Sequence, residues 1–306
     1  MLKNIFNRLM NTVVVLIGVS IIAFILVRLT PGNPAELMLT DTATEQQIAE
    51  MEIKMGLHQP LVIQYFRYMN NVLHGDLGYS YTFGRDVSEL VLNRLPYTLQ
   101  LTAVSFLMIW AISLPLGMLA GIHKGSVIDT VASGFALMGQ SMSSVWFGIL
   151  LMLVFAVKLK ILPTQGAGTW KNVIMPAMCA AFPFTAMSTR MLRSGMQDVL
   201  NEDYITATRA RGVSTMAVNL KYAFKNALLP LITIAGNQLG SMLAGSMVIE
   251  NIFGWPGLGA LTITSISQRD YQMLQSMMLV SAFITSMCIL LVDILYARVD
   301  KRITFN

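Results

Sequence analysis

Six long apolar segments constrain the fold of this chain more than any other feature of its sequence. A backbone surrounded by lipid must satisfy its own hydrogen bonds, and an α-helix of about 20 residues does so while it crosses the bilayer. The segments cover residues 10–29, 98–122, 131–157, 173–189, 228–248 and 273–297. The sequence therefore predicts an all-α, polytopic membrane protein with six transmembrane helices.

The composition excludes a water-soluble globular protein. Hydrophobic residues make up 55% of the 306 residues and charged residues only 12%, whereas soluble domains contain about 25% charged residues. The formal net charge is +5, but the basic residues are spread among the short loops between apolar segments. This distribution fits orientation in a membrane better than a nucleic-acid interface, so we expect no nucleic-acid partner.

The basic residues also predict the orientation, because Lys and Arg accumulate in cytoplasmic loops. Lys158, Lys160 and Lys171 run against the bias that results when both termini are cytoplasmic. The first apolar segment lacks an A-x-A cleavage site and is long enough to span, so we expect a retained helix rather than a signal peptide. The cytoplasmic side then receives most of the basic residues, namely Lys3, Arg8, Lys124, Arg190, Arg193, Arg209, Arg211, Lys221, Lys225, Arg298, Lys301 and Arg302.

The same segments predict the domain organisation. The parts are a first transmembrane helix (1–30), an external subdomain (31–96), a five-helix core (97–297) and a cytoplasmic tail (298–306). The external part is too polar to span. It contains helical patterns at 43–55 and 61–73, glycines at 75, 78 and 84, and a short helical pattern at 86–92.

A polar and basic stretch, Asn201 to Pro230, lies between two apolar segments, within an inner loop that we delimit at residues 190–227. Residues Glu202 to Gly212 are predicted to form a short amphipathic helix that ends at the glycine. Residues 221–226 lead the chain back to the membrane, where Pro230 opens the next span. Taken alone, such a helix is usually just solvated; the alternative is a docking element for a partner.

The middles of the apolar segments contain almost no ionisable residues. Secondary transporters commonly place such residues at membrane depth, which argues against a proton-coupled mechanism. The chain also lacks the G-x-x-x-x-G-K-[ST] phosphate-binding motif, so it cannot hydrolyse ATP alone. We expect no catalytic residues and an external energy source. An ATP-independent secondary transporter or channel for a small polar solute, and a scaffold protein without a pore, remain as alternatives.

The sequence predicts no metal site and no cofactor bound by the chain itself. Cys179 and Cys288 lie inside apolar runs, which favours packing over a disulfide or a thiolate site. The 23 methionines are scattered among all the apolar segments, where thioethers fill gaps more often than they bind soft ions. His58, His74 and His123 are separated by a helix or by the membrane.

The inner loop resembles the docking loop of the membrane-spanning subunits of binding-protein-dependent ABC importers, whose E-A-A-x-x-x-G element forms a coupling helix. Gly212 matches the glycine and Ala207 the first alanine, while Thr206 and Thr208 replace the other two residues. The peptide and nickel branch has a version close to E-D-Y-x-x-x-A-R-A-x-G. The chain matches it, apart from Thr208, at Glu202, Asp203, Tyr204, Arg209, Ala210, Arg211 and Gly212.

Further motifs of this permease family follow in order along nearly the whole chain. They are P-G-N-P at 31–34 for P-G-D-P, M-G-L with Q-P and Q-Y at 55–65, G-D-L-G-Y-S at 75–80, V-I-E-N-I-F-G-W-P-G-L-G at 248–259 with R-D-Y at 269–271, and D-I-L-Y with D-K-R at 293–302. Lys301 replaces a proline of the last motif. By this resemblance the chain is identified as a member of the peptide and nickel ABC importer permease family.

The resemblance implies the type I ABC importer permease fold in the inner membrane of a bacterium, with a small external helical subdomain between spans 1 and 2. It also implies alternating access driven by one or two ATP-binding subunits, which would bind ATP and Mg. A homologous second permease would complete a heterodimeric pore, and an extracytoplasmic solute-binding protein would deliver the solute. Short peptides and nickel or other metal chelates both stay open as substrates.

Three sets of candidate site residues follow. The coupling residues implied by the resemblance are Glu202, Asp203, Tyr204, Ala207, Arg209, Ala210, Arg211 and Gly212. The candidates for the translocation path are Gln140, Ser141, Ser144, Trp146, Asn237, Gln238 and Ser241. The candidates for contact with the binding protein are Glu250, Asn251, Trp255, Arg269 and Asp270. Simple structural roles compete with these: Trp146 in packing, Glu250 in an ion pair or a helix cap, and Trp255 in a turn.

Overall fold

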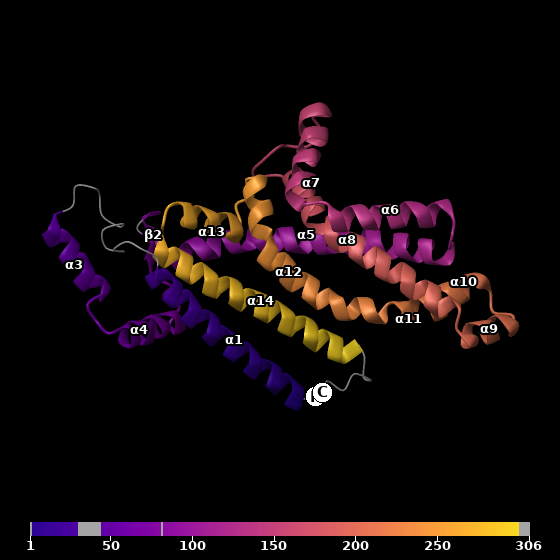
Figure 1. Ribbon diagram of the computed structural model, residues 1–306, viewed down its shortest axis with the longest axis horizontal. Helices are drawn as coiled ribbons and strands as arrows, with labels where there is room; N and C mark the ends of the chain where they lie inside the picture. Colours follow the sequence, from indigo (N-terminus) through magenta and orange to yellow (C-terminus); the bar gives the residue numbers. More distant parts are fainter. Residues whose placement is uncertain (1, 30–43, 81, 300–306) are drawn as a thin grey trace. The chain divides into compact units, whose positions relative to one another are not determined.

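The structure is a computed structural model that describes residues 2–29, 44–80 and 82–299 (Figure 1). Its elements in chain order are α1 (Leu2–Leu29), α3 (Glu45–Met55), α4 (Leu61–Leu73), β1 (Tyr79–Ser80), β2 (Arg85–Asp86), α5 (Val87–Ile122), α6 (Val127–Ser141), α7 (Ser144–Leu151), the π-helix η1 (Met152–Lys158), α8 (Trp170–Leu200), α9 (Asp203–Ala210), α10 (Thr215–Ala217), the π-helix η2 (Val218–Phe224), α11 (Lys225–Ala227), α12 (Leu229–Ile252), α13 (Leu258–Ser267) and α14 (Tyr271–Val299). The predicted all-α class is confirmed, with one two-stranded antiparallel hairpin that the sequence analysis did not anticipate.

The chain divides into two compact units, which are described separately. Unit 1 comprises Met1–Thr98 with Pro256–Met287, and unit 2 comprises Leu99–Trp255 with Cys288–Asn306. The predicted division into four parts stays a prediction. The P-G-N-P segment at 31–34 and the residues from 300 to 306, including Lys301 and Arg302, lie outside the described residues.

Unit 1 contains the two helices predicted for the external segment. The helix α3 begins with a capping box, in which Thr44 and Gln47 satisfy each other's backbone N–H groups, and it ends at Gly56 in the left-handed conformation with φ +70°. The helix α4 has the predicted bounds. The core of this unit joins the first turns of α5 to α13 and α14 through Val87, Leu90, Val91, Leu258, Leu261, Met273 and Met277.

Unit 2 is built around α8, which packs against α6, α7 and α12. Many of its residues between Val173 and Met196 are buried, Pro176 among them, whereas Pro183 is only half-buried. One buried cluster surrounds Cys179 and Phe253 at the middle of the unit. A second cluster lies at the far end of α8, where α9, η2, α11 and α12 meet it.

The predicted spans are helical, and one of them, at 131–157, is corrected below. Among the described residues, three helices are long and apolar enough to cross a membrane, within α1, α5 and α14, and two bent pairs raise the number to five at most. The predicted segment 173–189 lies within α8 but is not among them. Its prolines and hydroxyl side chains lower its hydropathy, and many of its residues are buried within the unit. Its status as a span stays a prediction.

The predicted span 131–157 is not a single straight helix. Here α6 and the α7–η1 segment meet at 112°, and α7 turns away from α6 in Figure 1. Met142 and Ser143 at the bend have extended backbones, so α6 ends at Ser141, whose Oγ donates to the carbonyl of Leu137. The short helix expected at 86–92 is also corrected, because α5 runs from Val87 through Pro96 without a break.

Candidate functional site

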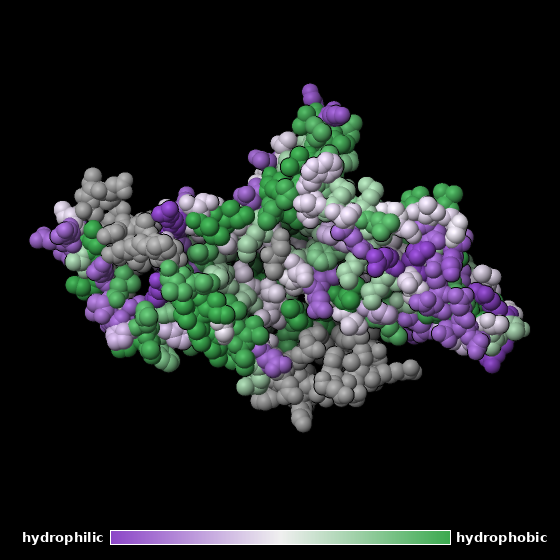
Figure 2. Space-filling model, viewed as in Figure 1, coloured by the Kyte–Doolittle hydropathy of each residue, from purple (hydrophilic) through white to green (hydrophobic). Residues whose placement is uncertain are grey.

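The predicted coupling helix is present as α9, and its candidate residues share one property. Glu202, Asp203, Tyr204, Ala207, Arg209, Ala210, Arg211 and Gly212 are all exposed. Figure 2 shows hydrophilic residues gathered over this end of unit 2, near α9 and α10. The arrangement leaves the charged surface of the helix available to a partner.

One buried residue holds α9 in place. Ile205 is fully buried in a cluster with Leu192, Met196, Val218, Ala223, Ala227 and Leu231. The Oη of Tyr204 accepts a hydrogen bond of 2.8 Å from the Nδ2 of Asn226 in α11, and the same Nδ2 donates to the carbonyl of Tyr222 in η2 at 3.0 Å. The sequence analysis did not single out Ile205; it is the only large aliphatic residue within α9, and that could have marked it as the anchor.

The glycine after α9 has the conformation that the motif requires. Gly212 has φ +79°, a left-handed backbone that side chains rarely adopt, and its N–H donates to the carbonyl of Arg209. No atom outside its immediate neighbours lies within 4 Å of a Cβ built at this position. The glycine is therefore needed for its backbone angle and not for space.

A pocket of about 940 Å³ lies in unit 2 beside the second half of α8. It is lined by Gln140, Pro183, Phe184, Met187, Arg190, Met191, Arg193, Ser194, Gly195, Asp198 and Pro230. Of the seven predicted path residues only Gln140 belongs to this lining, where its Oε1 accepts a 3.1 Å hydrogen bond from Arg190. The sequence analysis placed Arg190 and Arg193 in the inner loop and did not recognise that α8 carries them beside a pocket.

The other predicted path residues have different surroundings. On α12, Gln238 is buried and its Nε2 donates to the Oγ of Ser188 at 2.9 Å, so it joins two helices, whereas Asn237 and Ser241 are exposed. Ser141 and Ser144 flank the bend between α6 and α7, and Trp146 on α7 is 59% exposed. Their assignment to a path stays a prediction.

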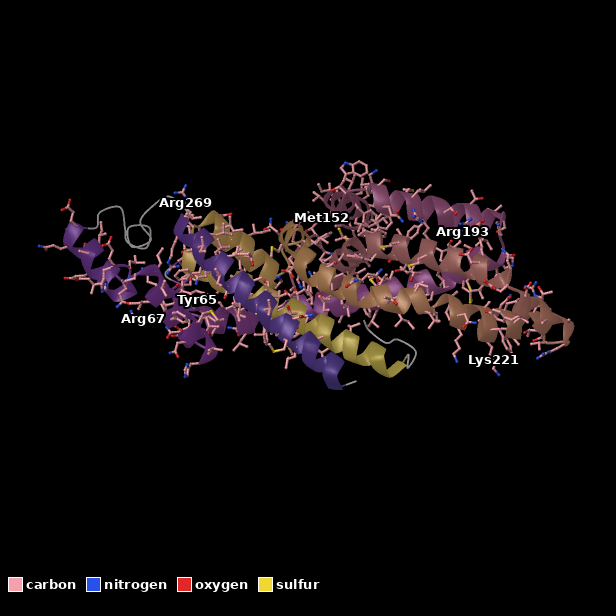
Figure 3. All side chains as sticks on the ribbon, turned by 60° about the horizontal axis from the view of Figure 1, so that its bottom comes forward. Tyr65, Arg67, Met152, Arg193, Lys221 and Arg269 are labelled. Carbon is pink, nitrogen blue, oxygen red and sulfur yellow. The ribbon has the colours of Figure 1, made fainter. Side chains whose placement is uncertain are left out.

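An ion pair joins α6 to α8 next to the pocket. The guanidinium of Arg193 donates to both carboxylate oxygens of Asp129, with 3.0 Å between Nη2 and Oδ2, and the N–H of Gly125 donates to the same Oδ2 at 2.9 Å. Figure 3 shows Arg193 beside these helices. The Asp129 side chain is only 7% exposed, so the pair fixes the two helices to each other from within the unit.

The residues proposed to contact a binding protein divide by exposure. Glu250, Trp255 and Asp270 are 0%, 2% and 4% exposed, so a partner cannot reach them in this conformation, while Asn251 and Arg269 are exposed. Asp270 instead accepts a hydrogen bond from Ser80 and, through Oδ1, one of 3.0 Å from the N–H of Met273 at the start of α14. The Oγ of Ser276 donates to the carbonyl of Leu77 at 2.7 Å. Two of the recognised motifs, at 75–80 and 269–271, thus bind each other.

The Q-Y motif on α4 has a structural role in unit 1. The Nε and Nη2 of Arg28 donate to the Oε1 of Gln64 at 3.0 and 2.9 Å, and the Nε2 of Gln64 donates to the carbonyl of Gln59 at 2.8 Å. The hydroxyls of Tyr65, labelled in Figure 3, and Ser20 are 2.8 Å apart. These bonds fasten α4 to α1, which explains the two polar residues in the motif.

Within the described ranges, no group of three or more His, Cys, Asp or Glu side chains is placed to hold a metal ion. The predicted absence of a metal and of a cofactor stays a prediction.

Comparison with known proteins identifies relatives over the full length of the chain. Residues 113–305 match the model of the family described as binding-protein-dependent transport system inner membrane component, and residues 1–102 match the model of its N-terminal part. The glutathione transport system permease protein GsiC of Salmonella paratyphi A is 38% identical over 100% of both chains. The oligopeptide transport system permease protein AppB of Bacillus subtilis is also 38% identical, over 98% of this chain and 99% of its own.

Solved structures share the fold at low sequence identity. A chain of the MetNI methionine ABC transporter, in an inward-facing conformation, matches 69% of this chain and 96% of its own with a TM-score of 0.55 and 17% identity. A chain of an amino acid ABC transporter matches 71% and 95% with a TM-score of 0.53 and 18% identity. The predicted ABC importer permease fold is therefore confirmed. With two family models and full-length relatives in agreement, the chain belongs to the family of binding-protein-dependent transport system inner membrane components.

Proposed function

We propose that this protein is a permease subunit of an ATP-driven importer that moves short peptides across the inner membrane of a bacterium. The relatives named above are permeases for glutathione and for oligopeptides, which favours peptides over nickel chelates. The chain itself performs no chemistry in this proposal. A homologous second permease completes the pore, one or two ATP-binding subunits bind ATP and Mg, and an extracytoplasmic binding protein delivers the solute.

The observation that carries this proposal is the construction of α9. Its charged residues are exposed, while Ile205 fixes it to the cluster shared by α8 and α12. A partner that binds the exposed side of such a helix and displaces it would also displace the transmembrane helices that its buried side contacts. Both termini and α9 then lie on the cytoplasmic side, in agreement with the distribution of basic residues.

Replacement of Gly212 by valine tests the coupling role. A β-branched residue at φ +79° costs about 1–2 kcal/mol of backbone strain, which corresponds to roughly 5- to 30-fold in a conformational equilibrium. In the complex reconstituted with its binding protein, we expect Gly212→Val to lower peptide uptake per ATP hydrolysed by a factor in this range. Gly75→Val is the matched control, because Gly75 also has a left-handed backbone, with φ +84°, and open space around it, and it belongs to unit 1.

Equal uptake per ATP in the two variants would contradict the role of α9. The partners are tested by purification of the chain from its native membrane in mild detergent. Recovery with a second permease and ATP-binding subunits is expected. Uptake by the chain alone, in vesicles without ATP, would instead support an ATP-independent transporter.

A further inference from the structure

The pocket beside α8 combines an apolar wall with charged groups at separate positions. Phe184, Met187 and Met191 supply apolar surface, and Arg190, Arg193 and Asp198 supply charge. Gln140 at the end of α6 and Pro230 at the start of α12 complete its lining on either side of α8. With the orientation proposed above, the pocket lies toward the cytoplasmic end of the transmembrane helices.

Only two of the three charges in the lining are available to a ligand. Arg193 is occupied by Asp129 through two hydrogen bonds. Arg190 donates to the neutral amide of Gln140, and within the described residues neither Arg190 nor Asp198 forms a salt bridge. The pocket therefore presents one cation and one anion whose charges are not balanced by neighbouring side chains.

The spacing of these two charges matches a short peptide. Arg190 and Asp198 are eight positions apart on the same helix, which corresponds to a rise of about 12 Å. An extended peptide spans at most about 3.3–3.6 Å per residue, so three or four residues cover this length. Between the two charges the lining contains Met191, Ser194 and Gly195, together with Arg193, which is occupied by Asp129. A thioether adapts its shape to different side chains and glycine leaves space, which suits a site that does not select by sequence.

We propose that this pocket binds a short zwitterionic peptide by its two ends, with Arg190 contacting the terminal carboxylate and Asp198 the terminal ammonium group. The guanidinium fork is suited to a carboxylate, and charge-assisted hydrogen bonds to both ends hold the peptide without use of its side chains. This inference rests on the proposed function and assigns one binding site along the route of the same substrate. Pairing of the two charges with a second permease subunit is the alternative that the experiment must exclude.

Binding of capped peptides to the assembled complex tests the proposal. The complex of permeases and ATP-binding subunits, in lipid nanodiscs without nucleotide or binding protein, is titrated with tri-alanine, its N-acetyl form and its C-terminal amide, and saturation-transfer NMR reports binding. Each cap removes one partly exposed charge pair, so we expect each capped form to bind about three- to fivefold more weakly.

The variants assign each end of the peptide to one residue. Arg190→Gln is expected to bind tri-alanine and its amide equally, Asp198→Asn to bind tri-alanine and its acetylated form equally, and Arg190→Lys to keep the preference for a free carboxylate. The controls Lys124→Gln and Asp86→Asn make the same charge changes at exposed residues outside the pocket, and they are expected to behave like the wild type.

Equal binding of all three peptides to the wild type, or unchanged preferences in Arg190→Gln and Asp198→Asn, would overturn the proposal. The pairing with a second permease predicts that outcome, because the two charges would then be occupied in the complex. ATP-dependent uptake of tri-alanine by the same complex with its binding protein distinguishes failure of the proposed site from failure of the proposed function. If tri-alanine is taken up but the three peptides bind equally, only the proposed site is refuted, whereas absence of uptake refutes the proposed function.

Discussion

Replacement of Ile205 by alanine is expected to release α9 from the rest of unit 2. The Ile205 side chain is fully buried, and it is the only residue of α9 that is. Its removal loses the transfer free energy of the deleted methyl and methylene groups and leaves a cavity among Leu192, Val218 and Leu231. Core Ile→Ala changes cost about 2–5 kcal/mol.

We expect this loss to lower the free energy of local opening of α9, because α9 is short and has no other buried residue. At 1.4 kcal/mol per factor of ten, the opening equilibrium of α9 rises roughly 30-fold to several thousand-fold, up to the point at which its amides exchange like those of an unstructured chain. Deuterium exchange of the purified chain, followed by mass spectrometry of peptides that cover residues 203–212, measures the change. We expect α6 to keep its wild-type exchange.

Met216→Ala is the matched control. Met216 belongs to the same loop and has a side chain of similar volume, but it is 72% exposed. Its removal is expected to change stability by less than about 0.5 kcal/mol and to leave the exchange of α9 unaltered. Unchanged exchange of α9 in Ile205→Ala, or equal changes in both variants, would refute the view that a single buried side chain anchors this helix.

Two further predictions concern the junction of α6 and α8. Asp129→Asn leaves the Arg193 guanidinium without its carboxylate and is expected to lower the free energy of unfolding by about 3 kcal/mol. This is the low end for a buried pair, because Arg193 keeps 27% of its side chain exposed. Denaturant unfolding in detergent measures the change, and a smaller loss of stability in the double variant Asp129→Asn with Arg193→Gln supports the pair as the cause. Gly139→Ala places a Cβ against the Cβ of Ala186 on α8 and is expected to lower the melting temperature. Gly134→Ala on the same helix meets no atom within 4 Å and is expected to stabilise α6 by about 0.5–1 kcal/mol. Equal melting temperatures of the two variants would show that α6 and α8 do not depend on the close approach at Gly139.

Much of the fold follows from local sequence patterns. The helices α3 and α4 have clear boundary signals, Gly56 at the end of the first and Pro60 before the second, and they appear where the patterns predicted them. Gly212 ends α9 for the same reason, since only its backbone angle is involved. Features of this kind depend on a few neighbouring residues and so can be derived from the sequence alone.

The features that were missed depend on residues far apart in the chain. Asp270 is a charged loop residue in the sequence, which favoured an exposed contact with a partner. In the structure its carboxylate accepts hydrogen bonds from the hydroxyl of Ser80 and from the N–H of Met273 in the first turn of α14. Asp129 and Arg193 are 64 residues apart and become partners only because α6 packs on α8. The bend at Ser141 also escaped the hydropathy pattern, because apolar composition does not report whether a helix is straight.

The two faces of α8 connect the candidate coupling helix to the candidate peptide pocket. Leu192 and Met196 point into the cluster that holds Ile205, while Arg190 and Asp198 line the pocket on the same helix. Packed cores have low compressibility, so a displacement of α9 moves α8 as a body instead of being absorbed locally. The Asp129–Arg193 pair extends the same connection to α6, whose last turn supplies Gln140 to the pocket. A push at α9 must therefore alter the position of both charges that we assign to the peptide, and this gives ATP binding a physical route to change the affinity of the pocket.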